Sequence, residues 1–146
     1  MTEIKYPAYN AKTKKFVAYK VRNEGPDGKK TRQPYWEPTL NGVPTTDLEF
    51  YGIRAAVDAS TVVVVEGEHI VDDLSDLDIA AVSPFNHTPC PEALAPLLNL
   101  ATVTVWGDND LPGQQKADAI IDALFATGHK NIKRCLLYTS PSPRDS

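Results

Sequence analysis

Cysteine is scarce in this chain, and long apolar runs are missing from it. The two cysteines among 146 residues, Cys90 and Cys135, have neither the spacing of metal ligands nor that of a disulfide framework. No apolar run approaches the roughly 18 residues that span a bilayer, and the first ten residues, MTEIKYPAYN, lack the hydrophobic stretch of a signal peptide. We therefore expect a globular protein in a reducing, cytoplasmic setting, with no membrane partner.

Charge is unevenly distributed along the chain. Residues 1–35 contain nine lysines and arginines against three acidic residues, whereas residues 36–134 contain five against fifteen. Such asymmetry is typical of a nucleic-acid-binding arm beside an acidic site, and equally of a solvated hairpin with lysine-rich turns. Charge alone leaves both interpretations open.

The C-terminal stretch CLLYTSPSPRDS, residues 135–146, breaks the pattern of the rest. It runs into Ser-Pro-Ser-Pro without periodicity, and it resembles a translation of the transposase adapter used in short-read sequencing. We interpret it as a sequencing-adapter artefact and exclude it from the predicted fold, with a natural Ser/Pro tail as the alternative. On this interpretation the natural protein continues beyond about Arg134, and the chain is a truncated fragment.

The first 59 residues are typical of a basic, β-rich segment. The stretches YPAYN and KFVAYKVRN predict two strands around the turn AKTK, and TRQPYW predicts a third after the turn EGPDGKK. A short helix is expected over residues 50–57.

From Thr61 onward, expected strands and helices alternate. The β-branched run TVVVVEG predicts a strand buried on both faces, and IAAVS, ATVTVWGD and NIKR predict three more. Helices are expected over EHIVDDLSDLD, over PCPEALAPLLNL with a break at Pro96, and over GQQKADAIIDALFATG with a stop at Gly128. This alternation predicts an α/β fold with a mostly parallel sheet.

Acidic residues follow two of these expected strands. Glu66 follows the first strand, and Asp108 and Asp110 follow the third. If these strands are neighbours, the carboxylates meet at the edge where open α/β sheets bind ligands. The two aspartates face the same way in extended backbone, and a divalent cation, Mg²⁺ or Mn²⁺, relieves their repulsion. Gly67 and Gly113 are expected to let the backbone turn tightly beside the site.

Two other local structures have sequences that start in the same way as residues 108–113. A plain turn with local side-chain bonds fits Asp-Asn-Asp before Pro-Gly, and it stays open for the motif taken alone. An EF-hand calcium loop does not fit, because its fifth position is Pro112 and its twelfth, which needs a bidentate Glu, is Ala119. The pairing with Glu66, about 40 residues earlier, favours the metal site.

The pattern over residues 60–134 resembles the TOPRIM domain, which is shared by bacterial-type DNA primases, topoisomerases, recombination proteins and certain nucleases. VVVVEGE resembles its first motif, and VWGDNDLPGQQKADAIIDAL resembles its second. The residues of these two motifs are most similar to those of phage and plasmid primases and primase-helicases, and so is the FYGI stretch that precedes them. The resemblance implies a Rossmann-like, mostly parallel TOPRIM sheet at 60–134, truncated, after an N-terminal primase-core segment at 1–59.

The same resemblance implies roles for the acidic residues. Glu66 is expected to act as general acid or base in nucleotidyl transfer, while Asp108 and Asp110 hold Mg²⁺ against the phosphates of the incoming nucleotide. The implied function is synthesis of RNA primers on single-stranded DNA during replication, in the cytoplasm of a bacterium or phage-infected host. Nucleoside triphosphates and a replicative helicase, fused or separate, are the further implied partners. The fragment alone is expected to be inactive.

One position departs from the primase pattern. Primases usually carry another acidic residue four places after the glutamate, where this chain has Ile70, and the helical register disfavours Asp72 or Asp73 as a substitute. The departure keeps two alternatives open: a TOPRIM nuclease that cleaves phosphodiester bonds, and a non-catalytic nucleic-acid-binding module. A topoisomerase is disfavoured, because topoisomerases lack the DNDLPG stretch that this chain contains.

Basic residues supply candidates for nucleic-acid or nucleotide contact. Lys29, Lys30 and Arg32 lie in the basic segment, and Lys116 lies on the helix after the second motif. We expect the first three to contact template or nucleotide. Lys116 either faces a phosphate or is a solvated lysine.

Resequencing the source DNA across codons 134 and 135 tests the interpretation of the tail. We expect the reading frame to continue through further strands, and into a helicase with a G-x-x-x-x-G-K-[ST] loop if the protein is a primase-helicase. A frame that does encode CLLYTSPSPRDS would contradict the adapter interpretation and favour the binding module.

Overall fold

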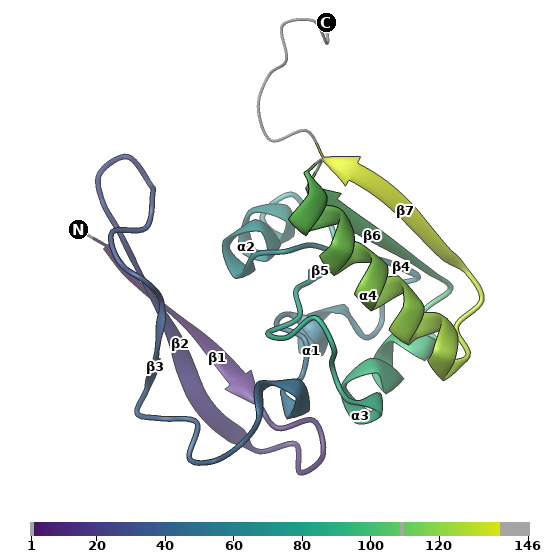
Figure 1. Ribbon diagram of the computed structural model, residues 1–146, viewed down its shortest axis with the longest axis horizontal. Helices are drawn as coiled ribbons and strands as arrows, with labels where there is room; N and C mark the ends of the chain where they lie inside the picture. Colours follow the sequence, from purple (N-terminus) through teal and green to yellow (C-terminus); the bar gives the residue numbers. More distant parts are fainter. Residues whose placement is uncertain (1, 109, 138–146) are drawn as a thin grey trace, which may run out of the picture.

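The computed structural model describes residues 2–108 and 110–137, which form two sheets (Figure 1). The smaller sheet is antiparallel, in the order β1 (Thr2–Tyr9), β2 (Phe16–Glu24) and β3 (Tyr35–Glu37). The larger sheet is parallel, in the order β5 (Ala81–Val82), β4 (Thr61–Val64), β6 (Thr102–Asp108) and β7 (Ile132–Leu137). The predicted α/β class, with a small β-rich segment before a parallel sheet, is confirmed.

Turn chemistry shapes the small sheet. Between β1 and β2, the side chain of Asn10 accepts hydrogen bonds from the backbone N–H groups of Lys12 and Thr13. Strand β3 is shorter than the predicted TRQPYW, because Pro34 has no N–H to donate to the ladder and the strand begins after it.

The parallel sheet is buried on both faces, as the continuous valine run predicts. In β4, Val62 and Val64 pack on one face with Val103 and Val105, whereas Val63 packs on the other. Strands β4 and β6 are the two central strands, and Val64 lies opposite Val105 in their register.

Helices cover the two faces. Helix α2 (Glu68–Ser75) packs on the Val63 face, and α4 (Leu111–Thr127) packs on the other. The region around Pro96 is a short helix α3 (Pro91–Leu94) followed by the 3₁₀ helix η2 (Ala95–Asn99), as the proline predicts. Helix α4 ends at Gly128, which adopts the left-handed conformation with φ 106°.

Short elements join the two sheets. The 3₁₀ helix η1 (Thr45–Asp47) and helix α1 (Ile53–Ala56) lie between β3 and β4. Tyr51 pairs with Ser83 in an antiparallel bridge beside β5, and its ring contacts that of Tyr6 from β1 at 5.2 Å between centroids. These contacts place the small sheet against the α2 side of the large one (Figure 1).

Strand β7 reaches beyond the predicted NIKR to Leu137, which is three residues into the expected artefact. Residues 135–137 continue the pairing with β6. The remaining residues, 138–146, lie outside the described part of the chain, and the origin of the whole stretch stays a prediction. No helix within residues 2–108 and 110–137 is long and apolar enough to cross a membrane.

Gly52 lies close to β5, next to the Tyr51–Ser83 bridge. It has φ +90°, and a Cβ there would lie 2.8 Å from the carbonyl oxygen of Ala81. Gly28 has φ +79° but nothing within 4 Å of such a Cβ. We predict that Gly28→Ala lowers the free energy of unfolding by about 1 kcal/mol through backbone strain. Gly52→Ala should cost about 1–3 kcal/mol more through overpacking. Urea denaturation of the two variants measures the difference, and equal losses would contradict the close packing.

Candidate active site

The carboxyl ends of β4 and β6 meet at the point where the strand order reverses. The chain leaves β4 for β5 on one side of it and leaves β6 for β7 on the other, with α2 and α4 on opposite faces. In open α/β sheets this switch point is where ligands bind. The expectation that the two strands are neighbours is therefore confirmed, and Glu66 and Asp108 lie at adjacent strand ends.

Glu66 is half-buried beside a basic residue from α4. Its side chain is 22% exposed, and Oε1 lies 3.5 Å from Nζ of Lys116. The Lys116 side chain is 48% exposed, so it is partly solvated as well as paired, and the alternative that it faces a phosphate stays a prediction. The ion pair brings a positive charge to the carboxyl edge of the sheet.

Asp110 caps helix α4. Its Oδ1 accepts a hydrogen bond of 2.7 Å from the backbone N–H of Gly113, which satisfies one of the free donors of the first turn. Asp108 is the last residue of β6, but its side chain, like all of Asn109, lies outside the described part of the structure. The side chains that are described contain no cluster of three or more His, Cys, Asp or Glu that could hold a metal ion. The predicted metal role of the two aspartates is thus untested.

Glycines allow close packing around this edge. Gly113 lies inside the first turn of α4, and Gly67 precedes α2 in an extended conformation with φ −139°. A Cβ at Gly67 would lie 2.7 Å from the ring of His69. At Gly107 in β6, a Cβ would lie 2.9 Å from the Cβ of Ala117. Close approach to α4 is therefore what Gly107 requires, whereas at Gly67 the neighbour is a side-chain ring that can turn away.

The position that departs from the primase pattern is part of the core. Ile70, on α2, is partly buried and packs against the cluster that Val63, Val65, Val71 and Ala81 form. Asp72, on the same helix, accepts a 2.6 Å hydrogen bond from the hydroxyl of Tyr51, and Asp73 is exposed. Asp72 is thus engaged at the junction with the segment before α1, in keeping with the helical register that disfavours it as a substitute.

The predicted nucleic-acid residues of the N-terminal segment do not join this site. Lys29, Lys30 and Arg32 are exposed in the β2–β3 loop, which projects away from the large sheet in Figure 1. Arg32 lies over the ring of Tyr35 at 4.5 Å from its centroid. A contact with template there would be separate from the carboxyl edge.

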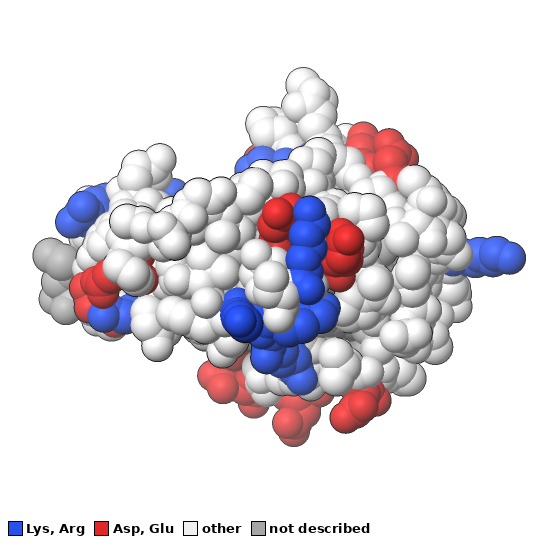
Figure 2. All heavy atoms as spheres, turned by 90° about the horizontal axis from the view of Figure 1, so that it is seen from below, with Lys and Arg blue, Asp and Glu red and all other residues white. Residues whose placement is uncertain are grey.

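Part of the basic charge of the segment is paired locally. Seen from below, lysine and arginine side chains gather near the middle of the face, with acidic side chains beside them (Figure 2). Lys12 pairs with Asp47 at 3.5 Å, and Arg54 of α1 pairs with Glu49 at 2.9 Å. This face is therefore not a uniformly basic groove.

Two residues near the carboxyl edge were missed by the sequence analysis. Lys20 of β2 reaches across to Glu68, at the start of α2, with Nζ 3.2 Å from Oε2, and Glu68 is buried. His87, in the loop after β5, lines a small cavity together with Glu66 and Lys116. The available signal for His87 was its place in a loop at the carboxyl edge of the sheet, where functional residues concentrate.

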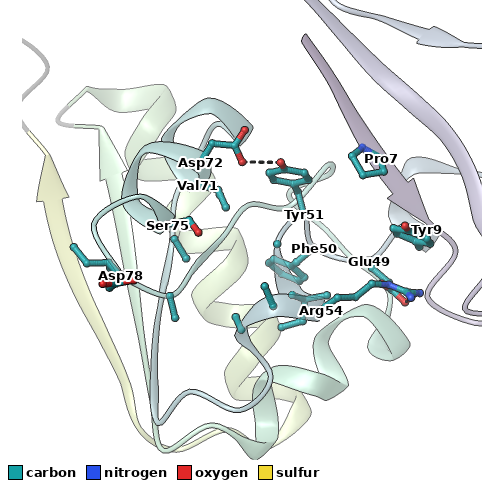
Figure 3. Close-up of a pocket in the computed structure, with 17 residues that line it drawn as sticks. Pro7, Tyr9, Glu49, Phe50, Tyr51, Arg54, Val71, Asp72, Ser75 and Asp78 are labelled. Atoms are coloured by element: carbon teal, nitrogen blue, oxygen red, sulfur yellow. Dashed lines mark hydrogen bonds and ion pairs between the residues drawn. The ribbon is translucent and has the colours of Figure 1, made fainter.

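A larger cavity of about 480 Å³ lies elsewhere, between β1, α1, α2 and the turn before β5. Figure 3 shows the Tyr51 hydroxyl directed at Asp72, with Ser75 and Asp78 on the same side and Arg54 across the cavity. Desolvation, followed by the hydrogen bond to Asp72, raises the pKa of Tyr51, so its hydroxyl stays protonated. This cavity contains neither Glu66 nor Lys116.

Two solved structures share this architecture. The crystal structure of a DNA primase domain from Pseudomonas aeruginosa matches with a TM-score of 0.69 and 18% identity, over 98% of this chain and 46% of that chain. The DnaG catalytic core matches with a TM-score of 0.71 and 16% identity, over 98% and 47%. The fold is shared with DNA primase domains. The chain spans about half the length of these structures, and no family model and no curated protein matches it.

The cap at Asp110 separates two roles of one carboxylate. We predict that Asp110→Ala lowers the free energy of unfolding by about 1 kcal/mol, because the first turn of α4 loses its cap. Asp110→Asn should change it by only about 0.3 kcal/mol, because asparagine caps as well as aspartate does. Thermal or urea unfolding measures both. Equal losses in the two variants would show that the charge, rather than the cap, stabilises the helix.

Proposed function

We propose that this chain is part of the catalytic core of a TOPRIM-type DNA primase of the phage or plasmid kind. It would synthesise RNA primers on single-stranded DNA by Mg²⁺-dependent nucleotidyl transfer. The observation that carries the proposal is the placement of Glu66 and the Asp108–Asp110 motif at neighbouring strand ends of the switch point. The shared fold with two primase domains supports it.

The donor set of the motif fits a hard divalent cation. Asp108 and Asp110 would hold Mg²⁺ (or Mn²⁺) through carboxylate oxygens, which are the ligands these ions prefer. Oδ1 of Asp110 accepts the capping hydrogen bond from Gly113, and the second carboxylate oxygen is left to coordinate the cation. When bound, the cation supplies positive charge that stabilises the triphosphate during transfer.

The chain's own residues then have distinct tasks. Glu66 takes the proton from the primer 3′-hydroxyl as this oxygen attacks the α-phosphorus of the incoming nucleotide and pyrophosphate leaves. Lys116, 3.5 Å from Glu66, holds that carboxylate and adds positive charge beside the phosphates. Glu66 is half-buried, so water competes less for its carboxylate. This strengthens the ion pair with Lys116 and the attraction of Lys116 for the phosphates.

Substitution of the acidic residues tests the proposal in the full-length protein that carries this sequence. We expect Glu66→Gln and Asp108→Asn to reduce primer synthesis on single-stranded DNA by on the order of 10²–10⁴-fold. Glu92→Gln, at an exposed site on α3, is the matched control and should retain activity. Undiminished primer synthesis by the Glu66→Gln variant would contradict the proposal.

Metal binding provides a readout besides activity. Mn²⁺ binding to this chain, followed by electron paramagnetic resonance, should weaken at least tenfold in Asp110→Asn although the helix cap survives. If the wild-type protein makes no primers but cleaves DNA when Mn²⁺ is present and nucleoside triphosphates are absent, the function is that of a TOPRIM nuclease.

One observation favours the binding module as a second candidate. Ile70 packs in the core at the position where primases usually carry a further acidic residue. A non-catalytic module predicts single-stranded DNA binding that is unaffected by Glu66→Gln, together with no Mn²⁺ binding near Asp110.

A further inference from the structure

The small sheet has aromatic side chains on the face that is turned away from the large sheet. Tyr6 of β1 faces the large sheet, where its ring contacts that of Tyr51. Lys20, which lies opposite Tyr6 in β2, also faces the large sheet and pairs with Glu68. Side chains alternate along a strand, so Tyr19, next to Lys20, faces the other way and is 39% exposed.

A β-bulge brings Phe16 to the same outer face. The register of β1 and β2 shifts after Ala8. Tyr9 lies opposite Phe16, which leaves Val17 as an extra residue in β2. In a regular strand Phe16 and Tyr19, three positions apart, would face opposite sides of the sheet. With the bulge their rings lie 4.9 Å apart between centroids, and Phe16 is 46% exposed.

Cationic side chains extend this row of rings at both ends. At one end, Nζ of Lys5 lies 5.8 Å from the centroid of the Tyr19 ring. At the other, the ring of Tyr9 lies 5.9 Å from that of Phe16, and the guanidinium of Arg54 lies 3.8 Å from the Tyr9 centroid. Aromatic rings combined with cations are typical of surfaces on which single-stranded nucleic acid stacks.

Positive charge beside the row is only partly neutralised. Lys5 and Arg54 are each paired with a carboxylate at 2.9 Å. Lys14 and Lys15, in the turn between β1 and β2, are exposed, and they take part in none of the ion pairs among residues 2–108 and 110–137. The carbonyl oxygen of Lys14 accepts a hydrogen bond from Arg54, so this turn lies at the Arg54 end of the row.

We propose that the row formed by Tyr9, Phe16 and Tyr19 with Lys5 and Arg54 binds single-stranded DNA by stacking of its bases. An unpaired strand fits this surface because its bases can be splayed out onto side chains, whereas the bases of a duplex are stacked on one another. The lysines of the adjoining turn would attract its phosphates. The choice of DNA over RNA rests on the proposed function, in which the template is single-stranded DNA, whereas the stacking surface does not.

Binding is tested in the full-length protein that carries this sequence, by fluorescence anisotropy of a labelled oligodeoxythymidylate of about 12 nucleotides. Phe16→Leu and Tyr19→Leu should each weaken binding on the order of tenfold, because leucine retains bulk but has no π-face. Tyr19→Phe keeps the ring and should bind as the wild type does. Phe125→Leu, at a similarly exposed ring on α4, is the matched control and should also bind unchanged. Thermal unfolding of each variant checks that its fold is intact.

Photochemical cross-linking locates the strand without any substitution. Ultraviolet irradiation of the wild-type complex should attach the DNA to the tryptic peptide of residues 16–20, which contains both exposed rings. Cross-links confined to other peptides, or wild-type affinity in both leucine variants, would overturn the inference. So would tighter binding of single-stranded RNA than of DNA, or leucine variants that lose self-association instead of DNA binding.

The salt dependence of binding tests the lysines of the turn. Lys14→Gln and Lys15→Gln should each reduce the slope of log Kd against log salt concentration by about 0.7, the contribution of one phosphate contact on a single strand. Lys130→Gln, at an exposed lysine before β7, should leave the slope unchanged. Wild-type slopes in both turn variants would contradict this placement of the strand.

The proposed function and this surface fail by different results. If Glu66→Gln retains full primer synthesis, the proposed function fails, while DNA binding that depends on the rings still supports the surface. If primer synthesis depends on Glu66 but DNA binding does not depend on Phe16 and Tyr19, the surface alone is refuted.

Discussion

The parallel pairing of β4 with β6 is the constraint on which the rest of the structure depends. Each strand is buried on both faces, so its register is set by the side chains that pack under α2 and α4. With Val64 opposite Val105, the two acidic strand ends reach the same edge. Gly107 and Ala117 then let α4 start close to that edge, which places Asp110 at the cap and Lys116 beside Glu66.

The order of strands and helices was predictable because it depends on local patterns. β-Branched runs specify buried strands, and Pro96 and Gly128 interrupt or end helices through their own backbone chemistry. Apolar residues within the predicted helical stretches are not all buried, since Leu77 is 70% exposed and Phe125 is 55% exposed. Periodicity gives the direction in which a side chain points, but it does not give how far the covered surface extends; α2 already ends at Ser75.

The candidate site divides in the same way. The placement of Glu66 and Asp108 was predictable because Glu66 closely follows β4 and Asp108 ends β6, and parallel strands bring their carboxyl ends to one edge. Lys20 and His87 were not, because their contacts join segments far apart in the chain and lie in no periodic pattern; Lys20 and Glu68 are 48 positions apart. The sequence shows that Ile70 replaces an acidic residue, but only the tertiary structure shows that Ile70 packs against the core.

The antiparallel bridge between Tyr51 and Ser83 has a consequence for assembly. Both backbone groups of Ser83 are engaged by Tyr51, with hydrogen bonds of 2.8 and 3.1 Å, so the outer side of the two-residue strand β5 is closed to a further strand. An open edge invites pairing with another chain and aggregation. The six-residue strand β7 is therefore the side on which this sheet can be extended, whether by a later segment of the same protein or by a neighbouring molecule.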